Sequence, residues 1–289
     1  MLQWYYIIIV SGVFMGVSTV VEKYALKAEH ATTYTAAFTI IAALAALVLT
    51  PFSTFNFGIA TLAIIYVASL LVAASYILIA KVYRHGNISV SSALTNSMPS
   101  LFVVLLSFVF LGERLKDLQY ASIAVMILAS YVFLTRYNRD QTDAKGRGVR
   151  YADTLIAASL VTAVGYVIVK YLLNSGISPI TYVLLSQIFV AFNMLIYMAV
   201  RFGGVKEISH NIKRNAGPLV AIGVMTVAYR VPLYISLSAT EASVAVPVLN
   251  AIFIIVTVMI GGFLFKEGNI MKKLALSAVL VAASYFLVL

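Results

Sequence analysis

Long apolar runs alternate with short polar segments along the whole chain. No charged residue lies between Ala31 and Ala80, a stretch long enough for two membrane crossings, because one crossing needs about 20 mostly apolar residues. The segment 51–58 (PFSTFNFG) divides this stretch, since Pro, Ser, Asn and Gly interrupt a helix. The pattern predicts an all-α polytopic membrane protein with about ten transmembrane helices, at 4–26, 32–50, 59–81, 88–112, 118–136, 152–173, 179–200, 216–238, 241–265 and 271–289.

The longest hydrophilic segment lies near the middle of the chain, at 136–153 (RYNRDQTDAKGRGVRYAD). Such a segment is the natural connection between two membrane-embedded units, since charged residues are costly in lipid. We therefore predict a first five-helix repeat at 1–137, a polar linker at 138–151 and a second five-helix repeat at 152–289.

The two halves resemble each other. Polar and aromatic residues recur at a constant spacing of 154, as in Asn96 and Asn250, Glu113 and Glu267, and the ASY segments 129–131 and 283–285. Five helices per half is an odd number, so the second copy is expected to enter the membrane from the opposite face. Many secondary transporters consist of such inverted repeats, because the halves can rock about a site at the midplane.

Composition excludes an ordinary soluble protein. The chain is 62% hydrophobic and 10% charged, whereas soluble domains are about half apolar and a quarter charged. The net charge of +10 comes from Lys and Arg at helix ends, and no basic helix or aromatic platform indicates nucleic-acid binding. There is no cysteine, and we expect no cofactor and no bound metal.

Basic residues also predict the orientation. Most Lys and Arg fall on the side of the linker, whereas the side that holds both termini receives mainly Arg114 and Lys116. The positive-inside rule places the linker in the cytoplasm and both termini outside, in a multi-pass protein of the cell membrane. The run from Trp4 to Val21 is longer than the apolar part of a signal peptide, so it is expected to remain as a membrane helix.

The segment 110–115 (FLGERL) carries a family resemblance. Together with ten helices in two halves, it resembles the EamA-type family of the drug/metabolite transporter superfamily, in which a Gly-Glu-(Arg/Lys)-Leu signature closes the fourth helix of a half. The second half departs from this signature and reads FKEG at 265–268. The resemblance implies export or import of amino acids, other metabolites or drugs.

Arg230 is the sharpest candidate for a substrate-binding residue. It lies well inside the helix predicted at 216–238, where an unpaired guanidinium is costly, so we expect it to face an internal cavity and to bind a carboxylate or phosphate. The alternative is a structural ion pair with Glu241 or Glu22.

Four further residues are expected to line the substrate path: Asn96, Asn250, Gln187 and Tyr76. The two asparagines occupy equivalent depths in the two repeats, and Tyr76 is the repeat counterpart of Arg230. Glu22 is a candidate for ion or proton coupling, although an interfacial ion pair with its neighbour Lys23 is the simpler expectation.

Three features are expected to be structural. Gly12 and Gly16 form a Gly-xxx-Gly motif that allows close helix packing. Glu113 and Glu267 each precede a predicted helix, whose positive N-terminal end favours an anion.

We therefore expect a secondary transporter that carries an amino acid or a related polar or anionic solute by alternating access. An exporter of drugs or cationic toxicants is the alternative within this class, and a channel or a non-transport membrane protein is the alternative outside it. No intramembrane Asp, HExxH motif or histidine cluster indicates an enzyme. The expected partners are the lipid bilayer and a small-molecule substrate, for a monomer or a homodimer.

Overall fold

A computed structural model describes residues 3–26, 31–85, 88–114, 116–132, 150–202, 206–266 and 269–286. Within these ranges the chain is helical and contains no strand. The first half comprises α1 (Gln3–Leu26), α2 (Ala31–Ala46) with the 3-10 helix η1 (Leu47–Phe52), α3 (Ile59–His85), α4 (Ile88–Phe110) and α5 (Asp117–Val132). The second half comprises α6 (Arg150–Asn174), α7 (Pro179–Phe202), α8 (Lys206–Arg214), α9 (Ala216–Ala239), α10 (Ala242–Leu264) and α11 (Ile270–Phe286).

The long helices match the predicted membrane segments to within a few residues. Eight of the described helices are long and apolar enough to cross a membrane, namely α1, α2 with η1, α3, α4, α6, α7, α9 and α10. The remaining pair, α5 and α11, has 16 and 17 residues within the described ranges. The expectation of an all-helical, multi-pass membrane protein is therefore confirmed.

The short helix α8 was not predicted. Ile208 and Ile212 lie one turn apart and pack against an apolar cluster formed with α2 and α9, whereas Lys213 and Arg214 in its last turn are exposed. A helix with two apolar residues gives no membrane-length hydropathy signal, which is why the pattern of long apolar runs missed it.

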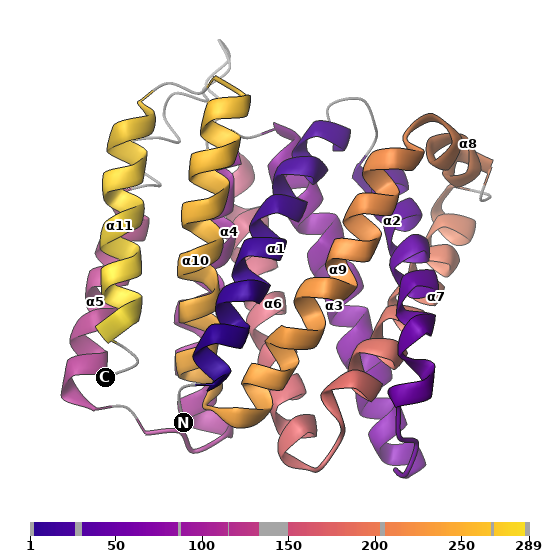
Figure 1. Ribbon diagram of the computed structural model, residues 1–289, viewed down its shortest axis with the longest axis horizontal. Helices are drawn as coiled ribbons and strands as arrows, with labels where there is room; N and C mark the ends of the chain where they lie inside the picture. Colours follow the sequence, from indigo (N-terminus) through magenta and orange to yellow (C-terminus); the bar gives the residue numbers. More distant parts are fainter. Residues whose placement is uncertain are drawn as a thin grey trace.

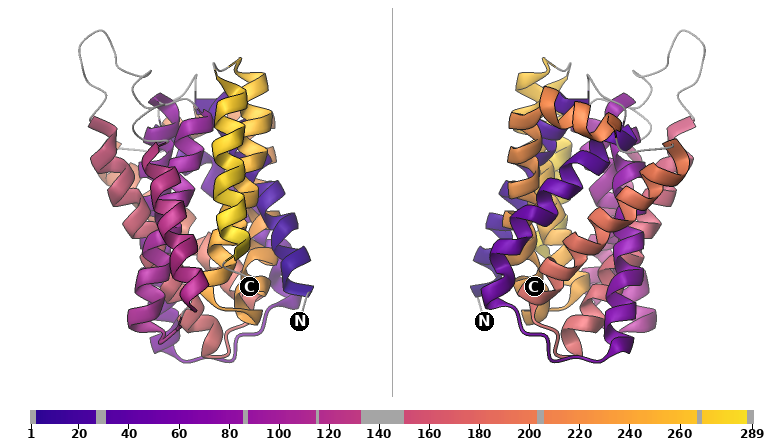
Figure 2. Two further views of the ribbon diagram at one scale, coloured as in Figure 1. Left: turned by 90° about the vertical axis from the view of Figure 1, so that its left-hand side faces the viewer. Right: turned by 90° about the vertical axis from the view of Figure 1, so that its right-hand side faces the viewer.

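The first helices of the two halves begin at opposite faces of the molecule. In Figure 1, α1 begins at the lower face, where both chain ends lie, and α6 begins at the upper face, where α5 ends; Figure 2 shows the same arrangement from the sides. Helix packing is reciprocal: α1 packs on α9 and α10, and correspondingly α6 packs on α3 and α4. The pairs α2 with α7, α4 with α10 and α5 with α11 also pack on each other.

The Gly-xxx-Gly motif brings α1 and α10 together. A Cβ atom on Gly12 would lie 2.8 Å from a methyl group of Ile252, and one on Gly16 would lie 2.6 Å from a methyl group of Val256. Both distances are shorter than normal contacts between carbon atoms. The predicted structural role of the motif is therefore confirmed.

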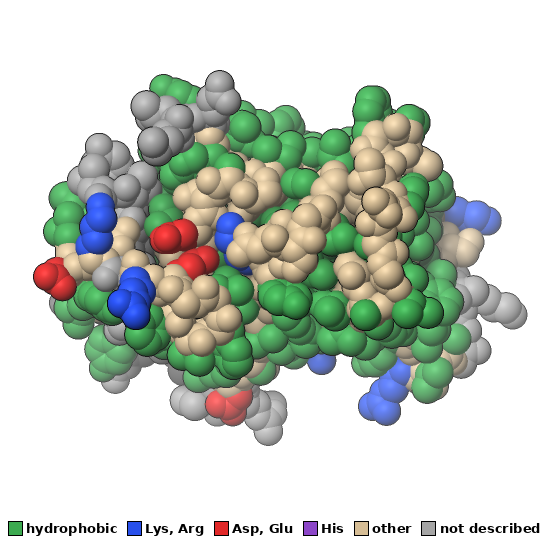
Figure 3. All heavy atoms as spheres, turned by 90° about the horizontal axis from the view of Figure 1, so that it is seen from below, with side chains coloured by type: hydrophobic (Ala, Val, Ile, Leu, Met, Phe, Trp, Pro, Cys, Tyr) green, Lys and Arg blue, Asp and Glu red, His purple; other side chains and the backbone are tan. Residues whose placement is uncertain are grey.

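Apolar side chains cover much of the surface. Ile59, Val200 and Val48 are 86%, 83% and 73% exposed, which suits contact with lipid tails rather than with water. Figure 3 shows the lower face, where acidic and basic side chains lie side by side in the middle of the left half of the view.

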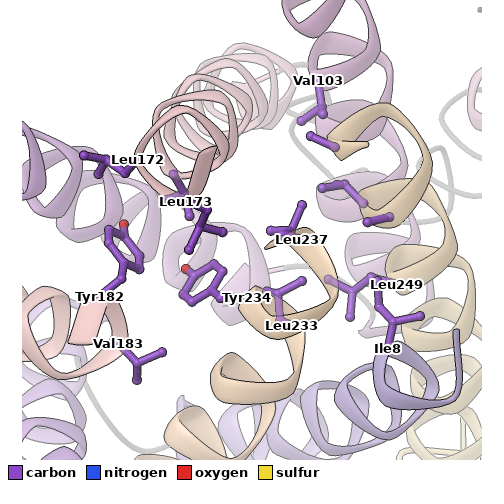
Figure 4. Packing of buried hydrophobic residues seen from close by; sticks show 14 of the residues in the cluster. Ile8, Val103, Leu172, Leu173, Tyr182, Val183, Leu233, Tyr234, Leu237 and Leu249 are labelled. Atoms are coloured by element: carbon purple, nitrogen blue, oxygen red, sulfur yellow. The ribbon is translucent and has the colours of Figure 1, made fainter. Parts of the chain in front are cut away.

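The apolar core joins helices of both halves. In Figure 4, Leu233 and Tyr234 of α9 lie between Tyr182 of α7 on one side and Ile8 of α1 with Leu249 of α10 on the other. The rings of Tyr182 and Tyr234 meet edge to face with centroids 5.0 Å apart. This cluster fixes the central part of α9, the helix that carries Arg230.

Candidate functional site

A cavity lies between α1, α3, α4, α6 and α9. Most of its wall is apolar, and its polar groups come from Ser75, Tyr76, Thr95, Asn96, Thr162, Tyr166, Tyr229, Arg230 and Tyr234. Helices of both halves therefore surround one central space, as expected for a substrate path between two repeats.

Arg230 is the only charged side chain among the described residues that line this cavity. It is 5% exposed, and its Nη2 donates to the hydroxyl of Tyr76 at 2.6 Å, while Nη1 lies 3.4 Å from the hydroxyl of Tyr234. With the Gln187 carboxamide turned so that its oxygen faces the guanidinium, that oxygen accepts from Nη1 at 3.0 Å and Nε at 3.3 Å.

All these partners of Arg230 are neutral. The pairing with Glu241 or Glu22 considered from the sequence is not among its contacts in the described structure. Burying a cation without an anion is costly, and three neutral oxygens offset that cost without cancelling the charge. The cavity therefore carries an uncompensated positive charge where an anionic ligand would be stabilised.

Aromatic rings surround the guanidinium. The Cζ atom of Arg230 lies 5.4 Å from the ring centroid of Tyr76, within the range of a cation–π contact. Phe38 adds a further ring to this aromatic group, because its ring lies against that of Tyr76 with the centroids 5.1 Å apart. Tyr234, one turn after Arg230 in the sequence, was missed as a site residue, although its i+4 spacing was a usable signal.

Asn96 lines the same cavity from α4. Its side-chain nitrogen donates to the Ser92 carbonyl at 3.0 Å and to Thr95 Oγ1 at 3.2 Å, and Thr95 in turn lies 3.0 Å from the Tyr83 hydroxyl. The carboxamide is thereby held by its own helix at the wall of the cavity.

Asn250 lies at a helix interface rather than at the cavity. Its side-chain nitrogen donates to the Asn96 carbonyl at 2.9 Å and to Ser100 Oγ at 2.8 Å, which ties α10 to α4. It is 2% exposed and is absent from the walls of the cavities described here. That Asn250 lines the substrate path therefore stays a prediction, since equal depth in the membrane does not fix the side of the helix on which a residue lies.

A second cavity, which shares lining residues with the first, is lined in part by Glu22. Lys23, which was expected to pair with Glu22, is buried, and its amine donates to the Tyr83 carbonyl near the end of α3. The neighbouring residues point to different sides of α1, since successive residues of a helix do not share a face.

Glu113 binds the N-terminus of α10, not that of α5. Its two carboxylate oxygens accept from the backbone nitrogens of Ala242 and Ser243, both at 3.0 Å. The anion therefore stabilises a helix N-terminus as expected, but a helix of the other half. Its counterpart Glu267 lies outside the described residues.

Lys170 holds the same turn between α9 and α10. Its amine donates to the carbonyls of Leu237 and Thr240, both at 2.8 Å. Burial and the nearby Glu113 raise the pKa of Glu241, which begins the next helix, and Lys170 partly offsets this. Within the described part of the chain, no three acidic or histidine side chains gather as metal ligands.

Fold and cavity together define a multi-pass helical membrane protein with a charged internal site. Residues 2–135 match the EamA-like transporter family, a family of the drug/metabolite transporter superfamily. The first half of the chain is thus an EamA-type unit, and the resemblance seen in the sequence is confirmed.

A solved structure shows the same fold over nearly the whole chain. This structure, named only "Crystal structure of protein", is 12% identical to the chain and has a TM-score of 0.58. The similarity covers 96% of this chain and 98% of the other. No curated protein sequence matches the chain significantly.

Proposed function

We propose that this protein is a secondary transporter that carries a small solute with a carboxylate or similar anionic group across the cell membrane. The observation that carries the proposal is Arg230, a buried guanidinium at a central cavity whose described partners are all neutral. Tyr76, Gln187 and Asn96 complete the site with hydrogen-bonding groups. Substrate binding would neutralise a charge that is costly in this environment.

We further propose that the molecule consists of two inverted five-helix repeats joined by the polar linker, with α5 and α11 as the fifth crossing of each. The reciprocal packing of α1 and α6 supports this arrangement. So do two contacts between residues 154 positions apart, Tyr76 with Arg230 and Asn96 with Asn250. Alternating access would then be a rocking of one repeat against the other.

The surroundings of Arg230 weigh against the alternatives. A buried cation repels a cationic drug, so export of cationic toxicants is disfavoured. A channel is usually lined by rings of charge or backbone carbonyls, whereas this cavity lies within one chain and has a largely apolar wall. The positive-inside rule favours a cytoplasmic upper face and external chain ends, and the arrangement requires no second copy.

The test is solute counterflow in proteoliposomes, because trans-stimulation distinguishes a carrier from a channel. Carboxylates should be compared with neutral and cationic solutes of similar size. Arg230→Gln should reduce carboxylate counterflow by roughly tenfold or more, the effect of losing one charged hydrogen bond. Arg201→Gln, at an exposed position in the last turn of α7, is the matched control and should leave the rate unchanged.

Two results would count against the proposal. If Arg230→Gln folds normally and carries carboxylates at the wild-type rate, Arg230 does not bind the anion. If the wild type shows no trans-stimulation with any solute class, it is not a carrier. Single-cysteine accessibility on either side of the membrane tests the inverted repeat directly, because the chain contains no native cysteine.

A further inference from the structure

Gly165 is a buried glycine that the backbone does not require. It lies in the interior of α6, and its conformation is open to any residue, since only Gly112 and Gly176 among the described glycines have a positive φ. In the interior of a helix glycine is less favourable than alanine. The reason for a glycine at this position must therefore lie in what surrounds it.

Close packing of helices is not that reason. The buried glycines Gly12, Gly16 and Gly223 allow two helices to approach, because a Cβ atom on each would lie 2.8, 2.6 and 2.7 Å from a side chain of a neighbouring helix. A Cβ atom on Gly165 would have no atom of another helix within 4 Å. Gly165 is thus enclosed by the protein and yet borders open space.

That space belongs to the cavity at Arg230. Arg230 lines this cavity from α9, and Gly165 lines it from α6. One face of α6 forms this wall, at Val161, Thr162, Gly165, Tyr166 and Val169. These positions lie on adjacent turns of one helix face, so the gap at Gly165 is bordered by two valines and a tyrosine ring.

The remaining wall favours an uncharged aromatic group. Four tyrosines line the cavity, at Tyr76, Tyr166, Tyr229 and Tyr234. Aromatic rings pack favourably against one another, edge to face or offset. Among the described residues of this wall none is acidic, so an ammonium group would lose its water here without gaining a carboxylate partner.

We propose that the space beside Gly165 holds the body of the solute whose anionic group binds Arg230, and that this body is an uncharged aromatic ring. The inference rests on the proposed function and specifies its substrate class: aromatic monocarboxylates without an amine. Gly165 is then a specificity-determining residue, because any side chain at this position would occupy the space of the ring.

The experiment measures dissociation constants by isothermal titration calorimetry on the purified protein, with acetate, phenylacetate and phenylglycine. Acetate carries the anionic group alone, phenylacetate adds a ring, and phenylglycine adds an amine to phenylacetate. The wild type should bind phenylacetate at least tenfold more tightly than acetate, the effect of burying a ring. It should also bind phenylacetate more tightly than phenylglycine.

Gly165→Val places a branched side chain in the space of the ring. It should weaken phenylacetate binding by roughly tenfold or more, whereas acetate binding should stay within about twofold, because the Arg230 end is unchanged. Gly165→Ala adds a single carbon atom and should fall between the wild type and Gly165→Val. Both variants should melt near the wild-type temperature or above it, since neither residue is a poorer helix former than glycine.

Gly217→Val is the matched control. Gly217 lies in the first turn of α9, is exposed, does not line the cavity, and likewise has no atom within 4 Å of an added Cβ. This variant should bind all three solutes with the wild-type dissociation constants. Should Gly165→Val fail to fold, the ratio of phenylacetate to acetate binding in Gly165→Ala decides the question.

The outcomes separate the inference from the proposed function. If the Gly165 variants keep the wild-type ratio while phenylacetate binding still depends on Arg230, the inference is overturned and the function stands. Binding of acetate or phenylglycine by the wild type at least as tightly as phenylacetate also overturns the inference. If the wild type binds none of the three solutes, or if Arg230→Gln binds phenylacetate as the wild type does, the proposed function itself fails.

Discussion

Glu113 is the residue whose removal is expected to weaken the connection between the two halves most directly. Glu113 follows the end of α4 and is 9% exposed. Each of its two carboxylate oxygens accepts a hydrogen bond from a backbone nitrogen in the first two residues of α10, both at 3.0 Å. Glu113→Ala removes both acceptors, and no intrahelical partner exists for the nitrogens of a first helical turn.

The magnitude follows from these two bonds. A buried donor left unsatisfied costs about 1–3 kcal/mol, and loss of an anion at a helix N-terminus costs a further 0.3–1 kcal/mol or so. Because the site lies close to the lower face, water can replace part of what is lost, and the lower ends of these ranges apply. We expect Glu113→Ala to lower the free energy of unfolding by about 2–4 kcal/mol and Glu113→Gln, which keeps one acceptor, by about half of that.

The assay is denaturant or thermal unfolding of the purified protein in one detergent, followed by intrinsic fluorescence. Arg114→Ala is the matched control, since it removes the charged side chain next to Glu113 at an exposed position. Its effect should stay within about 0.5 kcal/mol. If Glu113→Ala is no less stable than this control, the carboxylate does not stabilise α10 and the reasoning from the two hydrogen bonds is wrong.

Three further substitutions test other parts of the structure. Gly16→Val forces its side chain into Val256 and should cost about 1–3 kcal/mol of stability, whereas Gly58→Val meets open space and should cost little in the same unfolding assay. Gly165→Leu projects into open space from a cavity wall, so counterflow should fall at least severalfold while the melting temperature stays near that of the wild type. Glu241 has a raised pKa in the folded protein, so its contribution to stability is full below its ordinary pKa and is lost as the pH rises through the raised value. Glu241→Gln should therefore make the melting temperature vary less with pH across that range. A melting temperature that varies with pH as in the wild type contradicts this.

Helix positions were predictable because membrane crossing imposes a length that apolar residues must fill. The turn predicted at 51–58 is the clearest case, since η1 ends at Phe52 and α3 begins at Ile59. The opposite case is α8, which has nine residues and is too short to cross a membrane. Hydropathy therefore predicts segments that cross and misses those that do not.

The depth of the site residues along their helices was predictable from the sequence, but the side of the helix on which each residue lies was not. Arg230, Tyr76 and Gln187, each predicted separately to line the substrate path, lie together, because an intramembrane cation must find polar partners wherever they lie. Asn250 has the same depth as Asn96, yet it faces the neighbouring helix. A helix presents a new face every residue, and which face meets the cavity depends on how the other helices pack, which one sequence without relatives does not reveal.

A hydrogen bond from a buried lysine to a backbone carbonyl occurs in equivalent form in both halves. Lys23 donates to the carbonyl of Tyr83 near the end of α3, and Lys170 donates to that of Leu237 near the end of α9. Tyr83 and Leu237 are themselves 154 residues apart. In each half the first helix thus holds the end of the third by a buried amine, which the proposed inverted repeat places at opposite faces.

At the centre of the molecule, residues at equivalent positions of the two halves also contact each other, but one of the two pairs differs in chemistry. In the proposed inverted repeat, equivalent residues can touch only at the axis that relates the halves, and Tyr76 does contact Arg230, as Asn96 contacts Asn250. The asparagines are identical and join the halves, whereas a tyrosine opposes an arginine. In the proposed transport cycle each half would open in turn, but a solute with one anionic end needs a single cation. The asymmetric pair of Tyr76 and Arg230 would supply that cation to the solute from whichever face it enters.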